Sequence, residues 1–315
     1  MAQISNRRGR TSSFDAANQQ PPYVEYGPLV TEPPPASVQG AVLYGFFVRG
    51  SDTGISNLCQ RVFEDPSQGA VRCTPLWDSH MLLTFGSAAS LRSNSSPPIV
   101  LPEKQVILQV PVGIQYDSSP LRAVRPSLAW FAPFIWVDSA ITMADGREVY
   151  GYPKGFGTVD LEPNNWKFAL ETLGGDTNQT WQPHVLIKVE RHSTSLRRHS
   201  GDVEDTITRD MPDDMKKLFL ASISSQWTQV FLKQFRAIED GSLACLQQIT
   251  TATYDVIRTG LSLLIGDDYY LSLMALLSDK IGSEVGLSSQ RVATPFKLDL
   301  NMTMNAGQVL WPLPN

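Results

Sequence analysis

Short apolar runs rich in β-branched and aromatic residues recur along most of this chain, separated by turn residues, a pattern typical of β-strands. We expect strands at 41–48, 80–85, 106–115, 127–137, 158–161, 167–172, 185–190 and 296–304. Pro111 indicates an edge strand or a bulge, because proline cannot donate a ladder hydrogen bond. Apolar residues at helical spacing predict helices at 212–223 and 267–281. These patterns predict an α+β protein, mainly antiparallel β.

Length and composition allow one well-packed domain. The chain has 315 residues, of which 42% are hydrophobic and 18% charged, enough to bury a full core. Residues 1–38 are polar and contain a proline run, so we expect a disordered tail or an arm across a neighbouring subunit. Residues 39–315 are expected to form a single domain. Serine, arginine and aspartate cluster near 191–214, which predicts a mobile insertion.

Several classes of function find no support in the composition. A net charge of −5 gives no electrostatic case for nucleic acid, and the most apolar stretch is too short to span a bilayer. Three widely separated cysteines favour reduced, buried thiols over disulfides. The four histidines lack metal-ligand spacing, and no cofactor motif is present, so we expect no metal and no cofactor. Without a secretory signal, we expect a cytoplasmic protein.

The segment 138–161 is the strongest candidate for chemistry. It places Lys154 directly after Pro153 and among aromatic and glycine residues, where the side chain is held still. Removing water from around an amine disfavours the ammonium and favours the neutral nucleophile. If the segment is a strand, side chains alternate, and Glu148, Tyr150 and Tyr152 share a face with the lysine.

Residues 146–157 read G-R-E-V-Y-G-Y-P-K-G-F-G and resemble the signature of the acetoacetate decarboxylase family, G-R-E-L-x-x-Y-P-K-K-x-G. Weaker similarity covers 231–249 and 42–66. The resemblance implies the family's fold, a cone-shaped β-barrel with peripheral helices, and a homo-oligomer. In that family the first lysine of the pair forms a Schiff base with a β-keto acid, and it matches Lys154. The second lysine of the family is Gly155 here.

The resemblance also implies a set of site residues around this lysine. An ungapped count places the family's active-site glutamate at Gln115, which we expect to bind substrate. Arg147 is expected to orient a carboxylate or to stabilise the local fold, and Glu148 to hold Arg147 or move a proton. Tyr152 and Phe156 complete the predicted substrate-binding set.

The expected function is that of a lyase whose lysine forms a Schiff base with a small keto acid. The iminium would accept the electron pair left when a β-keto acid loses carbon dioxide. Gln115 in place of a glutamate makes a second reaction plausible, aldolase or dehydratase chemistry on a pyruvate-like acid in specialised metabolism. A third hypothesis, from another class, is a non-catalytic barrel that binds an apolar keto compound.

Overall fold

The computed structural model describes residues 23–24, 31, 33–93, 100–116, 126–165, 167–175, 180–191, 203–263 and 269–312. Its strands are β1 (Ala36–Arg49), β2 (Val71–Pro75), β3 (His80–Ser93), β4 (Val100–Tyr116), β5 (Ser127–Val137), β6 (Lys154–Phe156), β7 (Thr158–Glu162), β8 (Lys167–Gly175), β9 (Trp181–Arg191), β10 (Gln226–Arg236), β11 (Ala244–Leu263), β12 (Tyr269–Leu273), β13 (Gln290–Met304) and β14 (Gln308–Trp311). Its helices are α1 (Asp52–Cys59), η1 (Gln60–Glu64), α2 (Ala140–Asp145), η2 (Gly146–Tyr150), α3 (Val203–Thr208), α4 (Asp213–Ser224) and α5 (Ile281–Val285), with η1 and η2 in π geometry.

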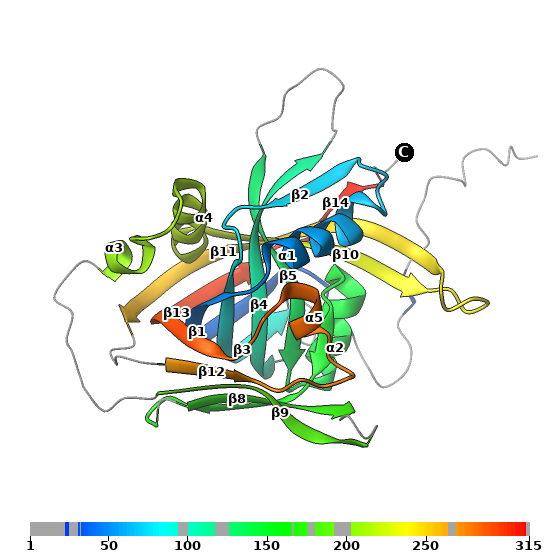
Figure 1. Cartoon of the computed structure of the whole chain (residues 1–315). Helices are drawn as coiled ribbons and strands as arrows, with labels where there is room; N and C mark the ends of the chain where they lie inside the picture. The colour runs from blue at the N-terminus through cyan, green and yellow to red at the C-terminus, as the bar shows by residue number, and fades with distance from the viewer. Residues whose placement is uncertain are drawn as a thin grey trace, which may run out of the picture.

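A closed ring of seven strands organises the described residues (Figure 1). Its order is β11, β10, β5, β4, β3, β1 and β13, and β13 pairs back onto β11 to close the ring. Neighbouring ring strands are antiparallel except β5 and β10, which run parallel. Closure leaves these strands without a free edge, and it encloses the side chains on their inner face. The mainly antiparallel prediction is confirmed.

A smaller sheet extends from the ring and covers part of its outer face (Figure 1). Strand β12 pairs with β13 and with β9, and β8 and β7 follow in antiparallel order. Phe168 of β8 packs against Phe46 and Phe85 of the ring, at ring-centroid distances of 5.6 and 5.7 Å. Strand β1 is therefore buried on both faces, which explains its nearly continuous apolar run.

Helix α4 packs against β10, β11 and β5. It begins after Pro212 with two acids in its first turn, where the helix dipole favours negative charge. Its residue Phe219 contacts Phe47 and Phe296 at centroid distances of 5.6 and 5.3 Å. Ser222 accepts a hydrogen bond of 2.7 Å from Trp130 Nε1. The helix predicted at 212–223 is confirmed.

The helix predicted at 267–281 is wrong. Residues Tyr269–Leu273 form strand β12, and the short helix α5 begins only at Ile281. Tyr269 and Leu271 are buried on one face of the strand. The apolar residues of this stretch therefore fit the two-residue alternation of a strand as well as helical spacing. Pairing with β9 and β13 on both sides decides the conformation, because tertiary contacts override helix propensity.

Two predicted boundaries change as well. Strand β1 begins at Ala36, so the last residues of the predicted tail belong to the sheet. Residues 203–208 form α3, and α4 begins at Asp213, so the predicted insertion near 191–214 ends in helices. Its first part, 192–202, lies outside the described residues. Both helices pack on the ring. They are therefore not part of a solvated insertion, which is what the polar composition indicated.

Strand β4 lies inside the sheet, and the irregularity predicted at Pro111 occurs nearby. The ladder between β4 and β5 shifts register between Leu108 and Val110. Along its other side, β4 pairs with β3 up to Gln109 and with β2 from Val112. Pro111 therefore lies where the partner strand changes, and its carbonyl accepts from Leu76 N at 2.9 Å. The missing N–H costs no ladder bond at this position.

The three cysteines differ in accessibility. Cys59 and Cys73 are buried, as predicted, whereas Cys245 is exposed on β11, and all three are free thiols. Burial raises the pKa of Cys59 to about 12 and that of Cys73 well above its ordinary value. We expect a thiol reagent to modify about one thiol rapidly in the folded protein and all three after denaturation, because the thiolate is the reactive form. Cys245→Ser should remove the rapid phase; a second rapid thiol would contradict the expectation.

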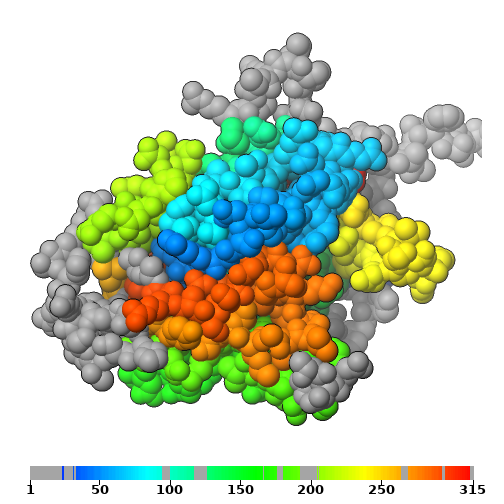
Figure 2. Space-filling view, in the orientation of Figure 1, coloured from blue at the N-terminus to red at the C-terminus, as the bar shows by residue number. Residues whose placement is uncertain are grey.

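The surface carries one clear projection. Figure 2 shows the hairpin that joins β10 and β11 standing out from the body of the molecule. Ile238 and Leu243 are exposed on it. Of the helices in the described ranges, none has the length and apolar character needed to cross a membrane.

Candidate active site

The segment that follows β5 is helical rather than extended. The Ser139 side chain accepts from Thr142 N and caps α2, and the chain continues into the π-helix η2. Gly151 ends it in the left-handed conformation, φ +83°, and Tyr152 N donates to Gly146 O at 2.9 Å. The strand conformation considered for this segment is therefore wrong before Lys154. The cap at the start and the left-handed glycine at the end bound a continuous helical segment from Ala140 to Tyr150.

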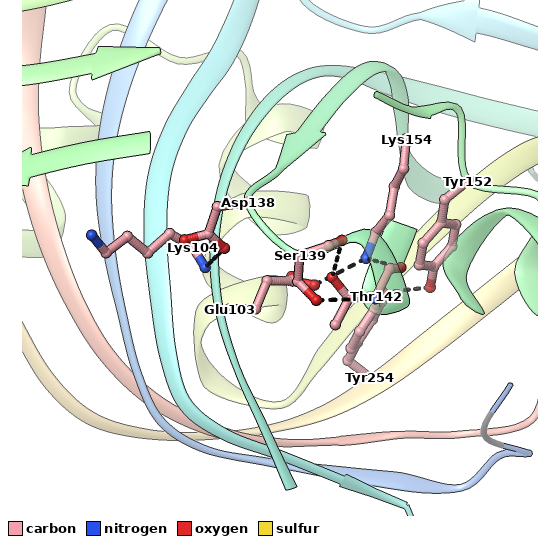
Figure 3. A network of polar contacts seen from close by, with 8 residues as sticks. All are labelled: Glu103, Lys104, Asp138, Ser139, Thr142, Tyr152, Lys154 and Tyr254. Atoms are coloured by element: carbon pink, nitrogen blue, oxygen red, sulfur yellow. Dashed lines mark hydrogen bonds and ion pairs between the residues drawn. The ribbon is translucent and has the colours of Figure 1, made fainter. Parts of the chain in front are cut away.

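Lys154 is the first residue of β6, which pairs parallel to β5. Its side chain points into the ring, and the residue is only 8% exposed. The amine Nζ donates to Glu103 Oε2 at 3.3 Å and to the carbonyl oxygen of Thr142 at 3.1 Å (Figure 3). It also lies 5.8 Å from the centroid of the Tyr152 ring. A lysine amine is thus held at a fixed position inside the protein, with a carboxylate in contact.

Glu103, on β4, is the carboxylate at this site. It is 8% exposed and forms a buried ion pair with the lysine. Strand alternation directs the next residue, Lys104, to the opposite face, where its Nζ donates to Val159 O at 3.4 Å. A buried pair of this kind costs desolvation on both sides, so it is weak evidence for stability. Both side chains line the same cavity, which makes the pair a candidate for chemistry.

The pair faces a cavity of about 80 Å³ that is lined mainly by the ring strands. The cavity receives residues from β1, β3, β4, β5, β10, β11 and β13, and from α2, η2 and β6. Its walls are mainly apolar, including Leu43, Ile107, Ile135 and Met302. A space of this size holds several waters or a small organic molecule.

Two tyrosines form a neutral hydroxyl pair beside the amine. The hydroxyls of Tyr152 and Tyr254 are hydrogen-bonded to each other (Figure 3). Tyr152 also stacks on Tyr150 at a centroid distance of 5.0 Å and contacts Phe231 at 4.3 Å. Burial is the main cause that raises the pKa of both Tyr152 and Tyr254 above the ordinary value. Both side chains therefore remain protonated at neutral pH and can donate hydrogen bonds.

A second polar group lines the cavity at Gln109. Its Oε1 accepts from Trp227 Nε1 and Gln229 Nε2, both at 3.1 Å, and the residue is 1% exposed. These two bonds fix the orientation of the carboxamide. Its Nε2 donors have no partner among the described residues, so they are available to a ligand in the cavity.

Comparison with known proteins was informative at the level of structure. No protein-family model and no curated protein matches this chain by sequence. The crystal structure of acetoacetate decarboxylase from Legionella pneumophila is similar over 97% of this chain and 98% of its own, with a TM-score of 0.57 and 13% identity. The enduracididine biosynthesis enzyme MppR complexed with pyruvate covers 88% of this chain and 91% of its own, with a TM-score of 0.55 and 14% identity.

A third solved structure agrees with these. An acetoacetate decarboxylase-like enzyme from Sphingomonas wittichii RW1 covers 91% of this chain and 96% of its own, with a TM-score of 0.51 and 11% identity. The chain has an acetoacetate decarboxylase-like fold. This supports the fold expected from residues 146–157.

Gln115 does not lie at this site. It is exposed on β4 and pairs with Arg72 of β2. It follows Glu103 by twelve residues of the same strand (115 − 103), which at about 3.3 Å per residue is roughly 40 Å. The carboxylate next to the lysine is Glu103, which sequence reasoning missed because a partner 51 residues away leaves no local pattern.

The other predicted residues divide between the cavity and the surface. Tyr152 lines the cavity, as expected. Arg147 is exposed and reaches the site from outside, where its Nη1 donates to the backbone oxygen of Lys154 at 3.2 Å. Glu148 is absent from the described lining of the cavity and accepts instead from the Tyr23 hydroxyl. Phe156 is 55% exposed and is absent from the described lining of the cavity, although alternation along β6 places it on the same strand face as Lys154.

The structure gives no support for a metal centre in its described ranges. Within them, no three histidine, cysteine, aspartate or glutamate side chains lie close enough together to hold a metal ion. The functional groups that line the cavity instead include the Lys154 amine, the carboxylates of Glu103 and Asp145, two phenols and three carboxamides.

Proposed function

We propose that this protein is a lysine-dependent carbon-carbon lyase whose Lys154 forms a Schiff base with a carbonyl substrate. The observation that carries the proposal is the Lys154 amine, 8% exposed and 3.3 Å from the Glu103 carboxylate, at the wall of a cavity lined by the ring strands. An amine in such a position has both a protected reaction space and a partner for proton transfer. We also propose that the seven-strand ring is the cone-shaped barrel expected from the resemblance.

The first half of the reaction uses the ion pair directly. Glu103 takes a proton from Nζ, and the neutral amine attacks the carbonyl carbon of the substrate to form a carbinolamine. Glu103 then returns the proton to the hydroxyl group, which leaves as water, and the iminium remains. Arg147 contributes by holding the backbone of Lys154, a positioning role.

The second half breaks a bond next to the iminium. With a β-keto acid, the bond to the carboxylate breaks, carbon dioxide leaves, and the electron pair moves to the nitrogen to give an enamine. Protonation of the enamine carbon and addition of water then release the ketone and the lysine. This decarboxylation is the reaction expected from the resemblance, and aldol cleavage uses the same electron sink. Which bond breaks depends on the group that the bound substrate carries next to the iminium. The charge of the cavity decides whether a substrate with a carboxylate can bind, so it also decides between the two reactions.

Reductive trapping tests the proposal. The protein is incubated with acetoacetate, pyruvate, a longer β-keto acid and neutral ketones, reduced with borohydride, and analysed by peptide mass spectrometry. We expect a substrate-dependent mass increase on the peptide that contains Lys154. A folded protein that gives no adduct with any of these compounds would refute the Schiff base and favour a non-catalytic binding barrel.

Gly146 is expected to be essential for the placement of the amine. A Cβ at this position would lie 2.7 Å from Lys154 Cδ and 2.8 Å from Cε. Gly146 has helical dihedrals, φ −61°, so alanine fits the backbone and the fold should persist. We expect Gly146→Ala to displace the lysine and slow trapping by about 10²-fold, the effect of a misplacement near 1 Å.

The matched control for this variant is Gly241→Ala, where an added Cβ meets no atom within 4 Å. Thermal unfolding of both variants should stay close to that of the wild type. Trapping at the wild-type rate in Gly146→Ala would show that the lysine tolerates the new methyl group.

A further inference from the structure

We propose that the substrate which condenses with Lys154 is an uncharged ketone or aldehyde rather than a keto acid. The inference rests on the proposed Schiff base and concerns the class of compound that enters the cavity. A keto acid brings a carboxylate into the ring, and this anion needs a cation or several hydrogen-bond donors to replace its water. The residues that line the cavity decide whether such a partner exists.

Among the described residues, Lys154 is the only basic side chain that lines the cavity. Its amine is already in contact with Glu103, and it remains bonded to the substrate once the iminium has formed. The acidic residues Glu103 and Asp145 both line the same space. A substrate carboxylate would therefore meet two acidic side chains, and the one cation, Lys154, is already paired with Glu103 or bonded to the substrate. Like charges in a buried site oppose binding.

The remaining cations that the structure describes near this segment do not line the cavity. Arg147 Nη1 donates to the backbone of Lys154 from outside, and Lys233 Nζ donates to Val149 O at 3.1 Å. Lys104 points outward and reaches the backbone of β7 (Figure 3). At position 155, where the resembling family has its second lysine, a Cβ would lie 3.2 Å from Trp136 Cδ1. A longer side chain at this position would meet that indole.

The pKa values of the two tyrosines, Tyr152 and Tyr254, are each affected by one of the two cavity acids. Burial is the largest cause of the raised pKa of Tyr152 and Tyr254. Asp145 adds to the shift at Tyr152, and Glu103 adds to the shift at Tyr254. Both acids therefore oppose a new negative charge near the amine, whether on a phenolate or on a substrate carboxylate.

Uncharged hydrogen-bond groups in the cavity suit a neutral oxygenated compound. The Nε2 donors of Gln109 are available, and Thr84 and Gln105 line the same space. Amides and hydroxyls are adequate partners for a carbonyl or hydroxyl oxygen, and the apolar wall suits an alkyl chain. The cavity is thus equipped for a neutral ketone that carries a further oxygen.

An uncharged substrate has no carboxylate to lose as carbon dioxide. Of decarboxylation and aldol cleavage, it can therefore undergo only aldol cleavage. With a β-hydroxy ketone bound as the iminium, Glu103 takes the hydroxyl proton, the carbon-carbon bond breaks, and an aldehyde leaves. The electron pair passes to the iminium nitrogen and gives an enamine. Protonation of the enamine carbon and addition of water then release the ketone and free Lys154, so atoms and charge balance.

Pairs of compounds with similar structure but different charge test this inference. Trapping rates at Lys154 are compared for acetoacetate and methyl acetoacetate, and for pyruvate and butane-2,3-dione, at equal concentrations. We expect the uncharged member of each pair to be trapped at least ten-fold faster. Cleavage of 4-hydroxypentan-2-one to acetone and acetaldehyde is measured alongside. Equal or faster trapping of the carboxylates would overturn the substrate class while the Schiff base stands, and no adduct with either member would overturn both proposals.

A gain of charge provides the complementary test. Gln105 is half-buried on β4 and lines the cavity, so Gln105→Arg adds a cation facing the substrate. We expect it to raise trapping of acetoacetate relative to its methyl ester by at least ten-fold. The matched control is Gln226→Arg, which adds the same charge at an exposed position of β10. A ratio that is unchanged in Gln105→Arg, in a variant that unfolds as the wild type does, would contradict the inference.

Discussion

Replacement of Lys154 by arginine is expected to abolish substrate-dependent trapping and to lower turnover by more than about 10⁴-fold. Arginine keeps the positive charge opposite Glu103 but is never deprotonated in proteins, so it cannot attack a carbonyl carbon. Removing a covalent nucleophile removes the step itself rather than weakening one contact. The measurement is borohydride trapping by intact-protein mass spectrometry, together with product formation from the best substrate found for the wild type.

Two further variants complete this test. Lys104→Arg changes the neighbouring outward lysine in the same way and should leave trapping unchanged. Lys154→Met should abolish trapping as well, and it should lower the free energy of unfolding by about 3–5 kcal/mol, because it leaves the buried Glu103 carboxylate without its partner. Trapping at the wild-type rate in Lys154→Arg would mean that another amine carries the chemistry.

Replacement of Glu103 by glutamine is expected to lower the trapping rate by about 10²- to 10⁴-fold, the range for loss of a positioned acid-base group. The amide keeps the shape of the side chain and can still accept a hydrogen bond from Lys154, but it cannot take a proton from the amine. The measurement is the rate of adduct formation as a function of pH. We expect the variant to recover part of its rate at alkaline pH, where hydroxide replaces the missing base.

The control for this variant is Glu171→Gln, at an exposed position of β8. It should not change trapping. A Glu103→Gln protein with the wild-type rate at neutral pH would show that Glu103 only holds the lysine in place. Loss of rate without alkaline recovery, with unchanged thermal unfolding, would also argue against the proton-transfer role.

Local chemistry in the sequence pointed to the lysine that we propose as the nucleophile. Pro153 before Lys154 and the glycines around it form a pattern that stands out in the sequence, and the structure places this lysine inside the ring. Most strands were also predictable, because their apolar runs are short and bounded by turn residues. The strand pairs β7–β8 and β1–β13 lie where these runs were found.

The remaining site residues were not predictable from local patterns. Glu103 lies at an ordinary strand position, and only the pairing of β4 with β3 and β5 brings it in front of the lysine. Gln109 and Tyr254 join the cavity in the same way, from strands far apart in the chain. The helix expected at 267–281 failed for a related reason, since pairing on both sides turned residues 269–273 into a strand.

The sequence by itself determined the secondary-structure class and singled out the amine that we propose to be reactive, because both inferences depend on neighbouring residues. Only the tertiary structure decided which carboxylate meets that amine and which charges line the cavity. Ring closure brings together side chains from strands that are distant in the sequence, and a charge acts on whatever lies within a few ångströms of it. The partner of Lys154, and the substrate class that we propose from the cavity charges, therefore depend on the closed ring.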